Sequence, residues 1–203
     1  MRIDLTSHDG WGLGWVAAEP AFMQRGSHAV LGDGGVWLFD PVDGDGLEEV
    51  LAGLGTVRGV VQLVDRHPRD CAVLAQRYGV PVHRVPKDGV PGLAAEPIVL
   101  HDRPWWREVA LWLPEHRALV VGESVGTAPY FLMDGDRVGL HPLARVSPPE
   151  QVLGRNPEHL LPGHGEALSG GDLEADLAAV IRRGRKDLPK AWLASARRFL
   201  PGV

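Results

Sequence analysis

The sequence predicts a mixed α/β protein in which two β-sheets pack face to face between outer helices, as a four-layer αββα sandwich. Three observations support this prediction. Apolar segments of strand length alternate with segments of helical periodicity. Short polar turns separate the strands of the middle part of the chain. The chain has 203 residues, 44% of them hydrophobic, which is enough to bury the core of one domain spanning residues 1–203.

The first part of the chain consists mainly of segments that are typical of β-strands. They are Trp11–Ala17, His28–Leu31 and Val36–Phe39, followed by a helical pattern at Leu47–Gly55. The apolar strand Val60–Val64 leads through the polar loop RHPRDC into a helix expected at Asp70–Tyr78, and the strand Val80–Val85 follows. The loop after a buried strand is where many α/β enzymes place their chemistry, so RHPRDC is a candidate site.

The second half predicts another sheet and further helices. Strands are expected in the segments IVLH, EVALWLP and ALVVGE. Ser147, Pro148 and Glu150 form a helix start signal with a capping box. The segment DLEADLAAVIRRG should form a helix that is capped by Asp172 and stopped by Gly184. A last helix, whose apolar face comprises Trp192, Ala196, Phe199 and Leu200, is expected to pack on the domain.

Composition and charge exclude several classes of partner. The net charge of −5 arises from interspersed acids and bases, without the basic stripe that a phosphate backbone requires, so we expect no nucleic acid partner. The sequence shows neither the apolar length of a membrane span nor the pattern of a secretory signal, so we expect a cytoplasmic protein without membrane contact. Trp11, Trp15 and the terminal helix are places where a homodimer contact could form.

Five segments occur in an order that resembles the metallo-β-lactamase superfamily of hydrolases. They are GGVWLFDP, GVVQLVDRHPRDC, RYGVPVH, EVALWLPEHRALVVGES and LLPGHGEAL, spread over roughly residues 28–168. The resemblance implies an αββα sandwich whose active site lies at the edge of the two sheets. It also implies that five loops bring histidines and carboxylates around one or two metal ions, usually zinc.

The metal-binding motif of that family is degenerate in this sequence. The family loop reads His-x-His-x-Asp-His, and an ungapped comparison with RHPRDC places Arg66 and Pro68 on the two leading histidines. The histidine of the family's middle loop falls near Pro104, where no histidine stands in register and His101 is three residues away. The resemblance therefore implies a divergent member that has lost the first of two metal positions.

The residues of the second metal position are either unchanged or replaced by other possible ligands. The comparison places Asp70 on the family's aspartate and Cys71 on the final histidine of the motif. Glu123 falls on the family's bridging aspartate, and His164 of PGHG falls on its last histidine. All four side chains can bind zinc. The resemblance thus implies one zinc or iron ion held by this set, with the carboxylates of Asp70 and Glu123 also in catalytic roles.

These candidates also have other interpretations. Asp70 can cap the helix that begins at Cys71. Cys71 is the sole cysteine, and it is either a buried packing residue or a thiolate stabilised by the helix dipole. Arg66 can pair with Glu123. In that case the ligands would be Asp70, Cys71 and His164 with one open position, and Glu123 would be available as a base.

The pocket around such a site has five candidate residues, Arg66, His67, His101, Trp105 and Trp106. Arg66 and His67 are otherwise exposed loop residues. Of two adjacent tryptophans, one commonly packs inward while its neighbour covers the edge. The remaining histidines show no ligand spacing and are expected to be structural or on the surface: His8, His28, His83, His116, His141 and His159.

Two functions are compatible with these residues. The first is a divergent hydrolase with a single metal ion that acts on a small ester, thioester or amide substrate. The alternative is a metal-free, non-catalytic pseudoenzyme of the same fold that binds a small molecule or a protein partner. A nuclease is disfavoured by the acidic net charge. Nothing in the sequence identifies the substrate.

Overall fold

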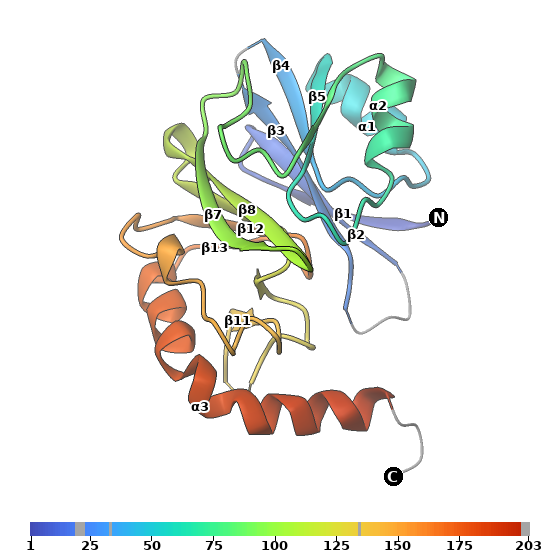
Figure 1. Cartoon of the computed structure of the whole chain (residues 1–203). Helices are drawn as coiled ribbons and strands as arrows, with labels where there is room; N and C mark the ends of the chain where they lie inside the picture. The colour runs from blue at the N-terminus through green and yellow to red at the C-terminus, as the bar shows by residue number, and fades with distance from the viewer. Residues whose placement is uncertain (19–22, 33, 134, 200–203) are drawn as a thin grey trace.

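Two β-sheets form the centre of the protein in the computed structural model, which describes residues 1–18, 23–32, 34–133 and 135–199 (Figure 1). The first sheet has the strand order β1 (Ile3–Ser7), β2 (Gly12–Ala17), β3 (Gly26–Gly32), β4 (Gly35–Phe39), β5 (Val57–Gln62) and β6 (Val82–Arg84). Its last two pairings are parallel, and they are connected through α1 (Leu47–Leu54) and α2 (Cys71–Tyr78).

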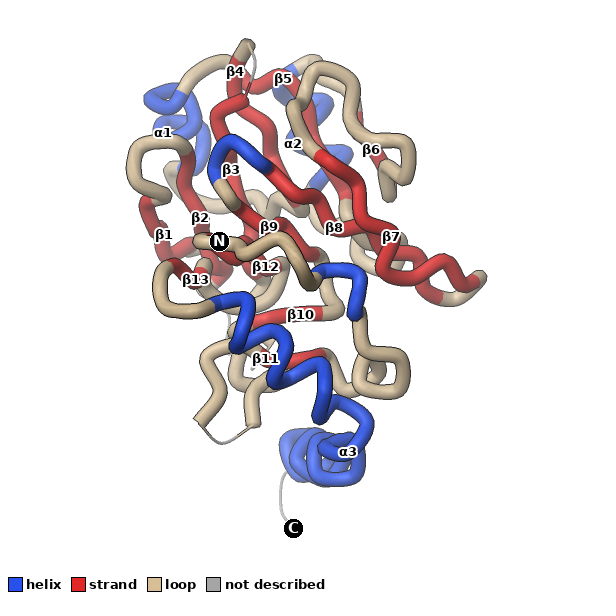
Figure 2. Tube along the Cα trace, turned by 90° about the vertical axis from the view of Figure 1, so that its left-hand side faces the viewer, coloured by secondary structure: helices blue, strands red, loops and turns tan. Residues whose placement is uncertain are grey.

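The second sheet has the order β13 (Leu168–Ser169), β12 (His159–Pro162), β9 (Ala118–Val121), β8 (Trp106–Leu113) and β7 (Glu96–Arg103). The short strands β10 (Val125–Gly126) and β11 (Gly139–Leu140) pair with each other, and β11 lies beside the long helix α3 (Leu173–Phe199). Seen from the side, α1 and α2 lie toward one end of the molecule and α3 toward the other, with the strands between them (Figure 2).

Successive side chains of a strand point to opposite faces of its sheet, so each sheet can pack on both faces. In β8, Val109 and Leu111 belong to the core between the two sheets, whereas Ala110 and Trp112 belong to the core beneath α3. Strands β4 and β5 alternate in the same way between the intersheet core and a third core beneath α1 and α2. These three apolar layers separate four layers of structure, so the predicted αββα sandwich is confirmed.

Helix α3 continues past the predicted stop at Gly184 and runs to Phe199, so that boundary is wrong. Gly184 serves close packing: a Cβ atom there would lie 3.0 Å from the side chains of both Leu140 and Pro148. The helix bends along its course (Figure 1), and it contains Pro189, a residue type that kinks helices.

The helix predicted after Ser147 is also wrong, because only a single 3₁₀ turn forms, at Glu150–Val152. Its N-cap residue is Pro149, and no side chain caps it. Gly154, at a φ of +87°, lies in the left-handed region directly after the turn, where the chain leaves the helical conformation. Asp172, in contrast, does cap α3 through a 2.9 Å hydrogen bond from the Ala175 amide.

The terminal apolar face does not pack as predicted. Trp192 is 55% exposed, and its neighbour Ala191 is the buried residue of this turn. The side chains of Ala196 and Phe199, and all of Leu200, lie outside the described residues. Trp15, suggested as a dimer contact, is 1% exposed and donates a hydrogen bond from Nε1 to the Val42 carbonyl, so it belongs to the core.

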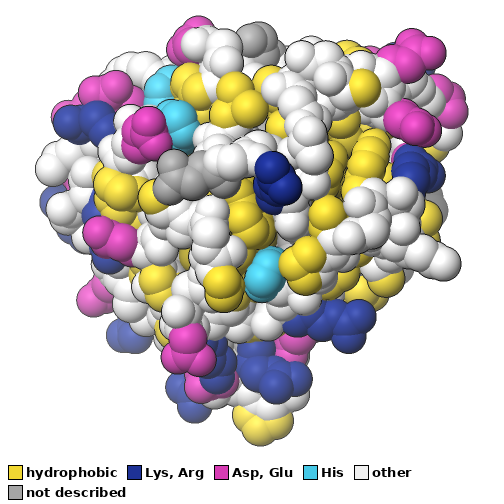
Figure 3. Space-filling model, turned by 90° about the horizontal axis from the view of Figure 1, so that it is seen from above, with side chains coloured by type: hydrophobic (Ala, Val, Ile, Leu, Met, Phe, Trp, Pro, Cys, Tyr) yellow, Lys and Arg dark blue, Asp and Glu magenta, His cyan; other side chains and the backbone are white. Residues whose placement is uncertain are grey.

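Charged side chains of both signs surround one face of the molecule, whose middle shows mainly hydrophobic side chains and uncharged atoms (Figure 3). Within the described part of the chain, no helix combines the length and the hydrophobicity that crossing a membrane requires.

Leu177 and Trp192 both lie on α3 but differ in burial, so we expect their substitution to change the free energy of unfolding by different amounts. Leu177 is fully buried, so Leu177→Ala should lower the free energy of unfolding by about 2–5 kcal/mol. Trp192→Ala should lower it by less than about 1 kcal/mol, because more than half of that side chain is in solvent. Urea denaturation of the two variants tests this; equal losses would mean that the end of α3 packs on the domain after all.

Candidate functional site

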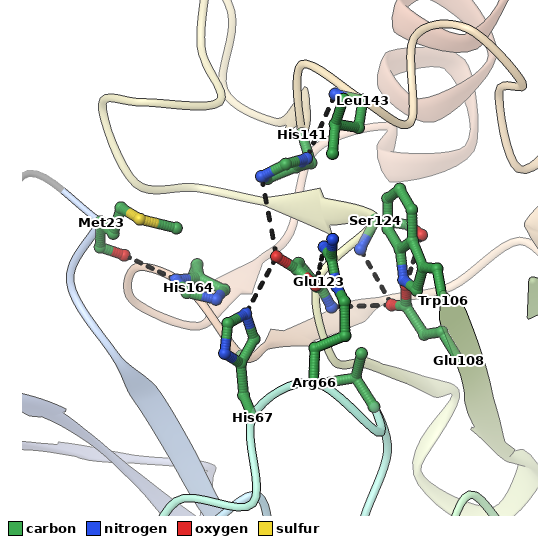
Figure 4. Close-up of polar contacts among 12 residues, drawn as sticks. Met23, Arg66, His67, Trp106, Glu108, Glu123, Ser124, His141, Leu143 and His164 are labelled. Atoms are coloured by element: carbon green, nitrogen blue, oxygen red, sulfur yellow. Dashed lines mark hydrogen bonds and ion pairs between the residues drawn. The ribbon is translucent and has the colours of Figure 1, made fainter. Parts of the chain in front are cut away.

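Three loops meet at the edge where the two sheets come together. Arg66 and His67 lie on the loop between β5 and α2, Glu123 follows β9, and His164 follows β12 (Figure 4). Two isolated β-bridges, Arg25 with His164 and Val64 with Glu108, link the backbone at this edge. A cavity of about 340 Å³ opens here, lined by Met23, Arg25, Arg66, His67, Pro68, Arg69 and His164.

Glu123 is the buried carboxylate at the centre of the site. Only 2% of its side chain is exposed. Arg66 Nη2 lies 2.6 Å from Oε2, His67 Nε2 lies 3.1 Å from Oε1, and His141 Nε2 is 3.7 Å from Oε1 (Figure 4). Burial alone would raise the pKa of Glu123, but the hydrogen bonds from His67 and Arg66 outweigh it and lower the pKa to about 2. Glu123 is therefore ionised at neutral pH.

His164 presents an unpaired ring nitrogen to this carboxylate. Its Nδ1 lies 2.9 Å from the Met23 carbonyl oxygen, which can only accept, so Nδ1 carries the proton. Its Nε2 is buried and has no hydrogen-bond partner. Burial, and next the charge of Arg69, lower the pKa of His164 to about 3, so the ring is neutral. Nε2 is thus a buried lone pair, the form in which histidine binds a metal.

His67, Glu123 and His164 form a group that could hold a metal ion. One ligand atom from each side chain lies within 4.8 Å of the others, and it is the sole such group of three or more among the described residues. The structure thus brings together two residues of the predicted ligand set, Glu123 and His164. It adds His67, which the sequence comparison placed between two motif positions.

Asp70 and Cys71 do not join this group. Asp70 Oδ2 accepts a 2.8 Å hydrogen bond from the Asp43 amide, and although Asp70 is the N-cap residue of α2, its side chain makes no capping bond. Cys71 is 1% exposed and packs in the core beneath α1 and α2, near Leu74. Burial, and next the charge of Asp40, raise the pKa of this thiol to about 12. The interpretation of Cys71 as a packing residue matches its surroundings.

The predicted set of Asp70, Cys71, Glu123 and His164 is therefore not assembled, because the loop turns its second half toward the first sheet. Arg69, at a φ of +45°, donates hydrogen bonds to the carbonyl oxygens of Gly26, Asp40 and Gly163. These bonds hold Arg69, rather than Asp70 or Cys71, next to the loop that carries His164. The smaller alternative set of Asp70, Cys71 and His164 is not assembled either.

Arg66 is held between a carboxylate and an aromatic ring. Its guanidinium carbon lies 4.5 Å from the centroid of the Trp106 ring, while Nη2 bonds Glu123. Trp106 is 1% exposed and Trp105 is 62% exposed, so one tryptophan packs inward and the other covers the edge, as predicted. His101 packs on Trp106 with ring centroids 4.1 Å apart.

Sequence reasoning missed two residues of the site. Glu108 is fully buried and accepts hydrogen bonds from four donors, the amides of Glu123 and Ser124, the Ser124 hydroxyl and Trp106 Nε1. It thereby fixes the backbone at Glu123. His141, expected to be structural or on the surface, is 6% exposed and faces Glu123, and its Nδ1 accepts the Leu143 amide. Neither residue stands in a ligand motif, so no local signal marked them.

Comparison with known proteins identifies the fold. No family model and no curated protein matches the chain. Solved structures do match. A metallo-β-lactamase from Pontibacter korlensis has a TM-score of 0.62 and 15% identity, over 91% of this chain and 99% of that one. The DIM-1 metallo-β-lactamase has a TM-score of 0.61 and 13% identity, over 92% and 98%. The protein has the metallo-β-lactamase fold.

This metallo-β-lactamase-fold protein also resembles a structure whose name is not that of a lactamase. The apo form of the chemotaxis sensor ODP from T. denticola has a TM-score of 0.53 and 13% identity, over 88% of this chain and 93% of that one. Identities this low establish the fold alone. Because one fold can carry different chemistries, function must be inferred from the site residues.

The loop that carries His164 in this metallo-β-lactamase-fold protein is anchored by a buried histidine pair. His28 Nε2 donates a 2.9 Å hydrogen bond to the Pro162 carbonyl, and His28 Nδ1 lies 3.3 Å from His8 Nε2. Because the carbonyl can only accept, His28 is protonated on Nε2 and accepts from His8. Burial, and next the charge of His8, lower the pKa of His28 from 6.5 to about 3. His28 therefore stays neutral in the folded protein.

This buried histidine predicts an acid dependence of stability. Between pH 6.5 and 3 the unfolded chain binds a proton at His28 that the folded protein does not, so stability falls as pH falls. Each such group contributes about 1.4 kcal/mol per pH unit. From pH 6 to pH 4, wild type should therefore lose stability relative to His28→Gln by about 1.4 kcal/mol per pH unit, so the difference between their free energies of unfolding should shrink. The free energies of unfolding are measured by urea denaturation at each pH. The same pH dependence in both proteins would contradict this.

A thiol with a raised pKa and 1% exposure should be unreactive. We expect Cys71 in the native protein to react with Ellman's reagent only on the timescale of unfolding, and one thiol per chain to react at once in denaturant. Rapid native labelling would contradict this expectation and show that Cys71 is an accessible thiolate.

Proposed function

We propose that this protein is a mononuclear metal-dependent hydrolase of a small ester, thioester or amide, with the ion held by His67, Glu123 and His164. The supporting observation is the buried, unpartnered Nε2 of His164, a residue that has a ligand atom within 4.8 Å of ligand atoms of the other two residues. A buried acceptor without a partner costs about 1–3 kcal/mol. A metal ion would satisfy this lone pair, and the bond from Nδ1 to the Met23 carbonyl already fixes the ring for that role.

The donor set fits a divalent transition metal. Two imidazoles and one carboxylate bind zinc in catalytic sites, where a fourth position stays open, and the same combination binds iron. When bound, such an ion supplies the Lewis acidity that polarises a scissile carbonyl. The set carries one negative charge, so it preserves more Lewis acidity than a set with Asp70, Cys71 and Glu123 together would.

The roles of the chain's own residues follow from their contacts. Glu123, with a pKa of about 2, is a weak base and is better suited as a ligand than as a proton acceptor. Arg66 can hold Oε2 of Glu123 while Oε1 faces the ion, because the two contacts use different oxygens. Glu108 keeps the Glu123 backbone in place through two amide hydrogen bonds.

A metal-free binding protein is the alternative, and the ion pair between Arg66 and Glu123 favours it. The carboxylate already receives hydrogen bonds from Arg66 and His67, so its charge is compensated without an ion. An incoming metal must displace the His67 contact at Oε1.

Elemental analysis of protein purified without an affinity metal or chelator tests the proposed function. We expect about one zinc or iron per chain in the wild type and little metal in His164→Ala and His67→Ala, because each loses one of three ligands. Cys71→Ala should keep its metal.

The matched control is His159→Ala. His159 stands at the opposite end of β12 from His164 and contacts the Ser169 hydroxyl, so its loss should leave the metal content unchanged. Wild-type protein that stays far below one metal per chain even after zinc is added would rule out the hydrolase and leave the metal-free binding protein.

A further inference from the structure

The cavity at the site presents positive charge to any ligand. Among the described residues that line it, three are arginines, Arg25, Arg66 and Arg69, and none is acidic. Two carboxylates belong to residues that contact this lining, and both are buried: Glu123, bonded to Arg66 and His67, is 2% exposed, and Asp40, whose carbonyl accepts from Arg69, is 1% exposed. A ligand that enters the cavity therefore meets guanidinium groups first. Cationic linings of this kind attract and hold anions.

Arg69 contributes a fixed charge. It hydrogen-bonds three neutral carbonyl oxygens, and within the described residues no carboxylate lies within ion-pair distance of it. The bonds tie the guanidinium to β3, to the end of β4 and to the loop after β12, so it cannot swing away. Its charge therefore remains part of the cavity wall whether or not a ligand is bound.

Arg66 retains capacity to bind. Among the described residues, its one hydrogen-bond acceptor is Glu123, bonded to Nη2, and Nε is buried without a partner. The Trp106 ring beneath the guanidinium and the Glu123 carboxylate at its end hold it in one orientation. A guanidinium held in this way is suited to planar recognition of an oxyanion, because its donors form a rigid fork that matches carboxylate and phosphate.

We propose that the cavity binds an oxyanion, a carboxylate or phosphate group of the substrate, with Arg66 as the direct contact and Arg69 as fixed supporting charge. The substrate class is then an anionic ester, thioester or amide. This class rests on the proposed function, whereas anion binding by the cavity does not require it. Hydrogen phosphate also carries an O–H group that the unpartnered Nε2 of His164 can accept.

Calorimetric titration with inorganic phosphate and with acetate, each against the same ionic strength of potassium chloride, tests this proposal. Chelator-treated and zinc-loaded protein are titrated separately. We expect phosphate or acetate to bind the wild type in at least one of the two forms, and Arg66→Gln to weaken binding about tenfold or more. Arg66→Lys, which keeps the charge but loses the fork, should weaken it less.

The control variant is Arg84→Gln. Arg84 lines a neighbouring hollow that shares Pro68 with the cavity, so its loss removes one positive charge nearby without touching the cavity wall. Binding in this variant should equal that of the wild type. Near-ultraviolet circular dichroism, which reports on all seven tryptophans, verifies that aromatic packing is intact in the Arg66 variants.

The outcomes separate this inference from the proposed function. Phosphate or acetate binding that depends on Arg66 in chelator-treated protein supports the inference even if no metal is ever found. Stoichiometric metal without any anion binding would overturn the inference and leave the hydrolase standing. Equal weakening in the Arg84 and Arg66 variants would also overturn it, because the effect would then be one of overall charge.

Discussion

The site depends on one buried negative charge, the carboxylate of Glu123. A buried carboxylate is stable only when donors compensate it, and here the β5–α2 loop provides them from Arg66 and His67. The contacts close into a ring. Arg66 stacks on Trp106, Trp106 donates to Glu108, and Glu108 accepts the amide of Glu123. Each member is positioned by the next, so the charge at Glu123 fixes the geometry of the whole edge between the sheets.

The fold brings these residues together through parallel strand pairs. β9 and β12 run parallel, so Glu123 and His164 leave their sheet at the same edge. Close backbone packing makes that approach feasible, since a Cβ atom on Gly163 would lie 2.1 Å from the Gly122 carbonyl oxygen. Arg69 then ties this loop to the first sheet. Close glycine packing and one arginine therefore hold the two loops beside each other.

Much of the fold could be predicted from the sequence, because alternation in segments such as EVALWLP directly encodes which face each residue buries. The errors arose where tertiary packing overrides local signals. Gly184 packs closely against neighbouring side chains and does not end a helix. The helix start signal at Ser147 is followed by a single 3₁₀ turn. At the site, the structure brings Glu123 and His164 of the predicted ligand set together with His67, whereas Asp70 and Cys71 lie apart from them. An alignment fixes positions along the chain, whereas the turn of the loop at Arg69 fixes which side chains face the cavity.

The guanidinium of Arg66 limits what the site can hold. Arg66 stands where the first histidine of the family motif aligns, and its charge meets Glu123 at Oε2. A divalent ion at that side of the carboxylate would face a guanidinium at contact distance, which opposes binding of a second positive charge there. At Oε1 the neighbours are imidazoles, of which His164 is neutral and His141 has a pKa lowered to about 4 by burial. Under the proposed function, this arrangement favours a single ion on the His164 side, and it leaves the guanidinium side for the anion that we propose.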